Sequence, residues 1–207
     1  MDNQYIVKLL ACIKDVMAKN RDYLIKLDSV VGDGDLGLTM GDGFSAAYQA
    51  VENAEETDIG KILYTAGKAM SSAVPSTMGT LMASGLMNAG KVLKGATKID
   101  LSGIALLFSA YMEGVSARGK AKVGEKTFLD GIYPAVSSLE NSQKNGAGMV
   151  QAAEDAYRAA KTGFEATKTM LAVHGRAATR GEASKTLEDP GAAVAVLIME
   201  GLVLSLK

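Results

Sequence analysis

Three aspartates lie close together in a glycine-containing stretch near the N-terminus, at Asp28, Asp33 and Asp35. Carboxylates gathered at short range repel one another unless a cation sits among them. Oxygen ligands without histidine or cysteine favour magnesium, and three acids can serve two ions. On composition alone, a solvated Asp-Gly turn is the commoner explanation, so both interpretations stay open at this point.

Two familiar glycine motifs do not explain this stretch. Residues Gly32 to Gly37 match the letters of the dinucleotide fingerprint GxGxxG, but no strand precedes them and the aspartates would repel a pyrophosphate. An EF-hand loop that starts at Asp33 needs glutamate at its twelfth position, where the chain has Phe44. Neither a Rossmann site nor an EF-hand is therefore expected.

A second stretch, Gly119 to Thr127, almost spells a phosphate-binding P-loop. The motif requires lysine directly after its second glycine, and Glu125 stands there instead. The stretch also follows an expected helix, whereas a P-loop follows a strand. As a turn that leads Thr127 into a helix N-terminus, it can still donate backbone amides to a ligand.

A third polar stretch, His174 to Gly191, contains Arg176, whose planar guanidinium suits phosphate oxygens. Asp189 and Pro190 then open a helix with free backbone amides. A surface arginine and a routine helix cap are the ordinary alternative. His174 is the only histidine and has no other ligand type at metal-site spacing, so we expect a solvated loop residue.

The segments around these stretches have helical periodicity and almost no strand alternation. About eight helices are predicted, joined mostly by short connections, around residues 6–17, 44–51, 58–70, 76–92, 100–115, and from 127, 148 and 189 onward, with a short further segment at 23–27. We therefore expect an all-α fold and one domain over residues 1–207. The long interruptions are Asp28 to Gly43, Gly119 to Thr127, and His174 to Gly191, and alternate loops of an up-and-down bundle lie at the same end.

Composition excludes several classes of function. The 22 basic and 23 acidic residues nearly cancel, which gives no sign of a nucleic-acid or membrane surface. A single cysteine, Cys12, excludes an internal disulfide and fits a reducing compartment. The most apolar run, Ala192 to Leu204, is too short to span a bilayer and carries Glu200. With no basic signal-peptide region at the N-terminus, a cytoplasmic protein is expected.

The ordered set of motifs resembles the ADP-binding L subunits of dihydroxyacetone kinases, over essentially the whole chain. The matching pieces are Asp28-x4-Asp33-Gly34-Asp35, Gly119-Lys120-Ala121-x2-Gly124-x-Lys126-Thr127, Gly175-Arg176-Ala177 with Gly181-Glu182, and Asp189-Pro190-Gly191-Ala192. Each piece alone is weak, whereas their order and spacing together are specific. The resemblance favours a metal site over an ordinary turn for the aspartates.

The resemblance implies an eight-helix antiparallel barrel with a nucleotide bound at one end. It implies that Asp28, Asp33 and Asp35 hold two magnesium ions, which bridge to the phosphates of ADP or ATP. It places the nucleotide against Gly37, Leu38, Thr39, Gly119, Phe128, Arg176, Asp189, Pro190 and Gly191. The resemblance also implies that the sugar is carried on a histidine of a separate K-type subunit, so no catalytic group is expected here beyond the metal and phosphate ligands.

The chain departs from the family pattern at two places. Leu36 stands where the family commonly has histidine, and the family's Gly-Gly-x-Ser-Gly turn is replaced by Pro75-Ser76-Thr77-Met78-Gly79. The hydroxyls of Ser76 and Thr77, and the free amides of Thr77 and Met78, can still bind phosphate there.

Three functional alternatives follow from the sequence. The nucleotide is either a resident cofactor recharged by a phosphocarrier protein of the phosphoenolpyruvate-driven phosphotransferase system, or ATP that exchanges after each turnover. The chain can also serve as a kinase subunit for another small ketose such as erythrulose. The rival from another class is a regulatory protein that senses the nucleotide and docks on a transcription factor.

Overall fold

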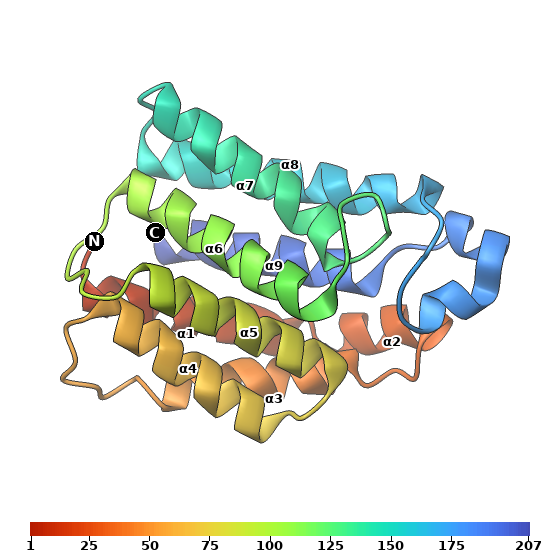
Figure 1. Ribbon diagram of the computed structural model, residues 1–207, viewed down its shortest axis with the longest axis horizontal. Helices are drawn as coiled ribbons and strands as arrows, with labels where there is room; N and C mark the ends of the chain where they lie inside the picture. Colours follow the sequence, from red (N-terminus) through yellow and green to blue (C-terminus); the bar gives the residue numbers. More distant parts are fainter.

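The computed structural model describes residues 1–207 as an assembly of helices, with one isolated bridge between Asp2 and Lys98 and no β-strand (Figure 1). The all-α prediction is confirmed. The α-helices are α1 (Asn3–Lys19), α2 (Arg21–Val31), α3 (Leu36–Gln49), α4 (Ile59–Ala73), α5 (Thr77–Val92), α6 (Leu101–Gly119), α7 (Phe128–Lys144), α8 (Met149–Ala166) and α9 (Pro190–Ser205), with 3-10 segments η1 (Thr167–Thr169) and η2 (Arg176–Thr186).

Eight of these nine helices form a closed ring. In order around it, α1 packs on α3, then α4, α5, α6, α7, α8 and α9, and α9 returns to α1. The remaining helix, α2, lies with η2 at one end of the ring, while both chain termini lie at the other end (Figure 1). The expected eight-helix barrel is therefore present, with α2 as an addition between α1 and α3.

The interior of the ring is one hydrophobic cluster of 50 buried residues. The helices supply it through apolar side chains at helical spacing, such as Ile6, Leu9, Leu10 and Ile13 on α1. Helices α4 and α5 approach each other closely at Gly60, where an added Cβ would lie 2.4 Å from the carbonyl oxygen of Gly90. No helix is long and apolar enough to cross a membrane.

The first long loop is much shorter than predicted. Helix α2 runs on to Val31 and α3 begins at Leu36, so only the turn 32–35 separates them. The expectation of a loop from Asp28 to Gly43 was wrong because Leu36, Met40 and Phe44 form a buried face of α3. Glycines between these apolar positions concealed the helical pattern.

Four helix N-termini lie at the end of the ring that carries α2. Helices α3, α5, α7 and α9 all begin there, since neighbouring helices around the ring run antiparallel. Three of them begin after a capping residue, where the side chains of Ser76, Thr127 and Asp189 accept backbone N–H groups of the first turn, and the cap at Asp189 was predicted. The partial positive charge of four helix N-termini is therefore concentrated at one end of the barrel.

Candidate functional site

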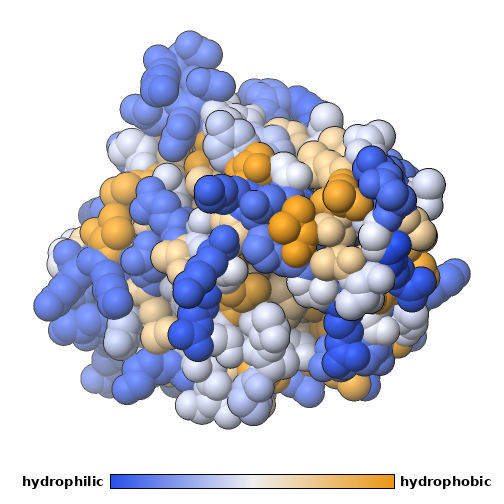
Figure 2. All heavy atoms as spheres, turned by 45° about the vertical axis from the view of Figure 1, so that its right-hand side comes forward, coloured by the Kyte–Doolittle hydropathy of each residue, from blue (hydrophilic) through white to orange (hydrophobic).

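A cavity of about 970 Å³ opens at this end of the barrel, between the turn 32–35, the starts of α5, α7 and α9, and the segment 174–177. In Figure 2, which turns this end forward, hydrophilic and hydrophobic residues are interspersed over that face. All three polar stretches that the sequence singled out contribute to the wall. Their convergence, which antiparallel topology made plausible, is a feature of the structure.

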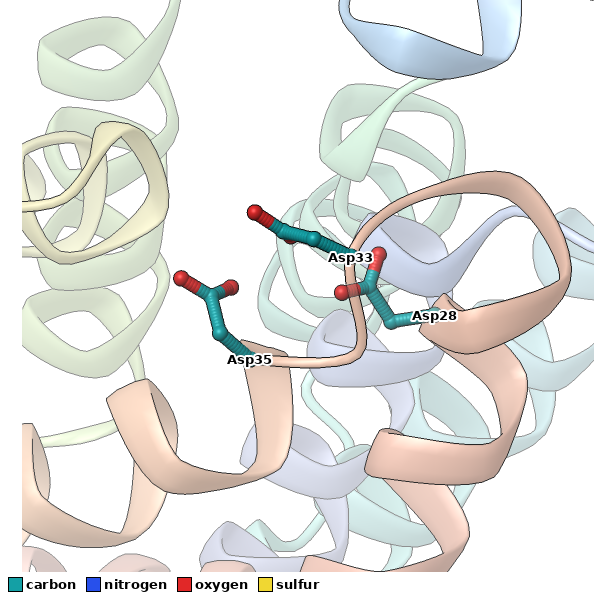
Figure 3. Close-up of side chains that lie close together, drawn as sticks. All are labelled: Asp28, Asp33 and Asp35. Atoms are coloured by element: carbon teal, nitrogen blue, oxygen red, sulfur yellow. The ribbon is translucent and has the colours of Figure 1, made fainter.

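The three aspartates form one carboxylate cluster on this wall. One oxygen from each of Asp28, Asp33 and Asp35 lies within 4.8 Å of the others. Asp28 comes from the last turn of α2, Asp33 from the turn, and Asp35 from the residue before α3, and their side chains reach toward a common space (Figure 3). Asp28 Oδ2 also accepts the amide of Gly34 at 2.9 Å, in a turn that requires a φ of +77° at that glycine.

The electrostatics of the cluster suit a divalent cation. Burial raises the pKa of Asp35, and the nearby negative charges of Asp33 and Asp28 raise it further. Asp35 occupies the N-cap position of α3 but makes no cap hydrogen bond, so its carboxylate is not used by the helix. An all-oxygen donor set with mutual repulsion fits magnesium, which would relieve that repulsion.

Arg176, the first residue of η2, lies next to this carboxylate cluster. Its guanidinium forms an ion pair with Asp33 at 2.5 Å, and the arginine side chain is 67% exposed. An exposed pair of this kind contributes roughly 0–1 kcal/mol to stability. The pair therefore says little about stability. It shows instead that Arg176, which is far from Asp33 in the sequence, lies next to the acidic cluster.

The start of α5 faces the same cavity through Ser76, Thr77 and Met78. Ser76 caps the helix by accepting the amide of Gly79 at 3.1 Å, and its hydroxyl lies 3.5 Å from that of Thr39. The amides of Thr77 and Met78 have no acceptor within the helix, because the first turn of any α-helix leaves its N–H groups free. These donors can take up a phosphate oxygen.

His174 differs from the solvated loop residue that we expected. Its Nε2 lies 2.6 Å from Glu125 Oε2, the side chain is 37% exposed, and the residue lines the cavity. The hydrogen bond from His174 is the largest cause of a lowered pKa at Glu125. The pairing joins two of the polar stretches, which the sequence could not show because its two residues are far apart in the chain.

Most of the predicted site residues line this one cavity. They are Asp28, Asp33, Asp35, Ser76, Thr77, Met78, Gly119, Phe128, Arg176, Asp189, Pro190 and Gly191. Gly37, Leu38 and Thr39 are not on its wall, and Gly37 packs on the backbone of Arg21, so their contact with a nucleotide stays a prediction.

Two basic wall residues were missed, Arg118 at the end of α6 and Lys126 before α7. Lys126 belongs to a motif quoted from the sequence, Gly124-x-Lys126-Thr127, but its spacing gave no indication that it is buried. Arg118 carried no signal beyond its position next to Gly119.

Comparison with known families matches residues 30–204 to the DAK2 domain. The ADP-binding subunit of the PEP-dependent dihydroxyacetone kinase of Escherichia coli (strain K12) is 33% identical over 202 residues, which cover 98% of this chain and 96% of that subunit. An L-erythrulose 1-kinase of Mycolicibacterium smegmatis is 32% identical over 199 residues, or 95% of this chain and 34% of that enzyme.

Among solved structures, the native dihydroxyacetone kinase of C. freundii superposes with a TM-score of 0.75 at 22% identity, covering 99% of this chain and 35% of that one. The same enzyme in complex with AMP-PNP and Mg²⁺ also gives a TM-score of 0.75. At this level of identity, the likeness establishes the fold.

Proposed function

The chain belongs to the DAK2 domain family, and on that premise we propose that it is the nucleotide-binding, phosphoryl-donating subunit of a dihydroxyacetone kinase. The observation that carries the proposal is a single cavity with three clustered carboxylates on one side and helix N-termini around them. The carboxylates suit a cation, whereas the helix N-termini suit an anion. A magnesium–nucleotide complex satisfies both halves of the cavity at once.

In this proposal, the clustered carboxylates of Asp28, Asp33 and Asp35 hold magnesium, with two ions sharing the three side chains. Bound magnesium supplies positive charge that stabilises a transferring phosphoryl group. The amides of Thr77 and Met78 orient phosphate oxygens, and Arg176 turns from Asp33 to the phosphates. The contribution of the chain is mainly positioning and electrostatic stabilisation, as in other phosphoryl transfers.

We further propose that the ketose is held by a K-type partner and that residues 1–207 act as one nucleotide-binding domain. The continuous core of 50 buried residues supports a single domain. Val30 and Val173 are exposed apolar side chains next in sequence to the wall residues Val31 and His174, and they support a partner that covers this end. An ADP-binding relative of Lactococcus lactis is named as PTS-dependent, which supports a phosphocarrier protein as the source of phosphate.

A second candidate is a kinase for erythrulose instead of dihydroxyacetone. The specific observation is that an L-erythrulose 1-kinase is 32% identical, almost the same as the 33% of the dihydroxyacetone kinase subunit. Both candidates use the same nucleotide site and differ in the ketose that the partner presents. A panel of small ketoses, assayed with one K-type subunit, distinguishes them by the substrate with the highest kcat/KM.

The metal assignment is tested by calorimetric titration of ADP with magnesium and with EDTA. We expect EDTA or Asp33→Ala to weaken ADP binding more than tenfold, about 1.4 kcal/mol or more. The reason is that removing one carboxylate from a shared cluster weakens every remaining metal contact. Asp42→Ala is the matched control, since Asp42 is an exposed aspartate of α3 away from the cavity wall. Equal ADP affinity with magnesium and with EDTA would contradict the assignment.

A further inference from the structure

Residues 168–186, which run from η1 through η2, form an excursion between α8 and α9 that carries both His174 and Arg176 to the cavity. Its ties to the rest of the protein include partly exposed ion pairs, Arg176 with Asp33, His174 with Glu125, and Lys168 with Glu165 and Glu188, and a 3.3 Å hydrogen bond from the amide of Val173 to the carbonyl oxygen of Glu125. Such pairs contribute little to stability. The apolar support is a small separate cluster of Val31, Ala172 and Ala177, with Leu187 packed against it. A stronger tie is needed to fix where Arg176 lies.

The base of this excursion is closed by one buried ammonium group. Lys126 is 2% exposed, and its Nζ donates hydrogen bonds to the carbonyl oxygens of Thr167 and Leu187, each at 2.5 Å. These two carbonyls flank the excursion on either side. Thr167 adds a second link at the same place, since its hydroxyl accepts the amide of Asp189 at 3.1 Å.

The conformation and the burial of Lys126 are both energetically unfavourable, which is unexpected for a residue that only fills space in the core. Lys126 has a φ of +60°, in the left-handed region that is unfavourable for a residue with a side chain. Burial lowers the pKa of its ammonium, which the negative charges of Asp189 and Asp130 partly oppose. Both carboxylates are themselves buried and accept backbone amides. A buried charge is weak evidence for stability, and the two hydrogen bonds that this ammonium makes hold Thr167 and Leu187 in a specific geometry.

We propose that Lys126 is a positioning residue that joins the two ends of segment 168–186 and thereby sets Arg176 over the aspartate cluster. Its effect on ligand binding rests on the proposed nucleotide function, whereas its effect on the segment does not. Lys126 acts through backbone carbonyls, so any side chain that cannot donate to both of them releases the segment. Arg176 then loses its fixed distance to Asp33 while the helical ring stays intact.

Hydrogen exchange measured by mass spectrometry tests the effect on the segment. In Lys126→Met we expect exchange of amides in 168–186 to rise at least tenfold, with helices α1, α4 and α6 unchanged. Lys122→Met is the matched control, because Lys122 is exposed in the same loop and its side chain makes no hydrogen bond or ion pair. Lys126→Arg keeps the charge and several donors, and we expect it to recover part of the protection. Unchanged exchange in 168–186, or a rise spread equally over all helices, overturns the proposal.

A double-mutant cycle on ADP affinity tests whether the effect acts through Arg176. With magnesium present, Lys126→Met is expected to weaken ADP binding about tenfold in the wild type and less than twofold in Arg176→Ala. Equal losses in both backgrounds overturn the link to Arg176. If the wild type does not bind ADP, the proposed function fails, and the exchange experiment alone decides the role of Lys126. If Lys126→Met does not fold, Lys126→Arg is measured in the same way: a rise in exchange confined to 168–186, or its full protection by the retained donors, supports the proposal, and a rise spread equally over all helices overturns it.

Discussion

At the scale of residues, Asp33 can bind two positively charged partners, the guanidinium of Arg176 and a magnesium ion. Asp33 is paired with Arg176 in the structure, and in the proposed function it shares magnesium with Asp28 and Asp35. An arginine and a metal ion compete for the same carboxylate because both bind its oxygens. In the proposed function, binding of magnesium and nucleotide would therefore free the guanidinium of Arg176 to interact with the phosphates.

Replacement of Arg176 measures this contribution. We expect Arg176→Ala to weaken ADP binding in magnesium by roughly 1.5–3 kcal/mol, the range for hydrogen bonds to charged groups. Arg176→Lys should recover only part of the loss, since an ammonium cannot form the two parallel hydrogen bonds of a guanidinium. Calorimetry of both variants checks the expectation, with Arg180→Ala as a control, because Arg180 lies on the same segment and off the cavity wall. An unchanged ADP affinity in both Arg176 variants would place this residue outside the site.

At the scale of elements, helix starts were the most predictable feature of the chain. Asp58, Asp100, Thr127 and Asp189 all precede helices as expected, because a short polar side chain before an apolar periodic run accepts first-turn amides. The stretch from Asp28 to Gly43 was misread, since glycines at 37, 41 and 43 hide the periodicity of α3. Lys126 was missed because burial of a lysine depends on distant carbonyls, which no local pattern records.

Ser76, the N-cap of α5, is expected to contribute both to the stability of the protein and to ligand binding, and these two contributions can be measured separately. Ser76→Ala removes the acceptor for the amide of Gly79 and should cost about 0.5–2 kcal/mol of unfolding free energy. It should also weaken ADP binding several-fold, because Ser76 lies on the cavity wall. Asp58→Ala is the matched control, as it removes the cap of α4 at the opposite end of the barrel. Urea unfolding and calorimetry of both variants are compared, and an equal effect of the two on ADP affinity would exclude a ligand role for Ser76.

At the scale of the whole molecule, ring closure explains why distant motifs meet. Eight antiparallel helices place every second N-terminus at the same end, so the starts of α3, α5, α7 and α9 converge there. The sequence indicated the motifs and made a shared end plausible. It could not indicate which side chains line one cavity, because that depends on how the ring closes through the packing of α9 on α1. The pairing of Arg176 with Asp33 crosses that closure, whereas His174 and Glu125 lie beside the neighbouring helices α7 and α8.

In the proposed function, this chain binds the nucleotide and a K-type partner binds the ketose. The purified chain should not phosphorylate dihydroxyacetone, whichever nucleotide is supplied. Its cavity has carboxylates that suit a cation and amides that suit phosphates, and the one group suited to act as a base, His174, is adjacent to Gly175 and Arg176 of the proposed nucleotide site. A coupled assay checks this, first with the chain alone, then with a K-type subunit and ATP, and finally with the K-type subunit, phosphocarrier protein and phosphoenolpyruvate.

Activity that appears only with the complete phosphocarrier system identifies the nucleotide as a resident cofactor, because each turnover must then recharge the bound ADP. Activity with ATP and the K-type subunit indicates free exchange of nucleotide instead. Either result agrees with a chain that supplies phosphate and leaves the ketose to its partner. A substantial rate from the lone chain that disappears in His174→Ala would contradict this division, since the cavity would then have to bind and deprotonate a ketose hydroxyl by itself. His174 would in that case act as the general base, with Glu125 orienting its ring.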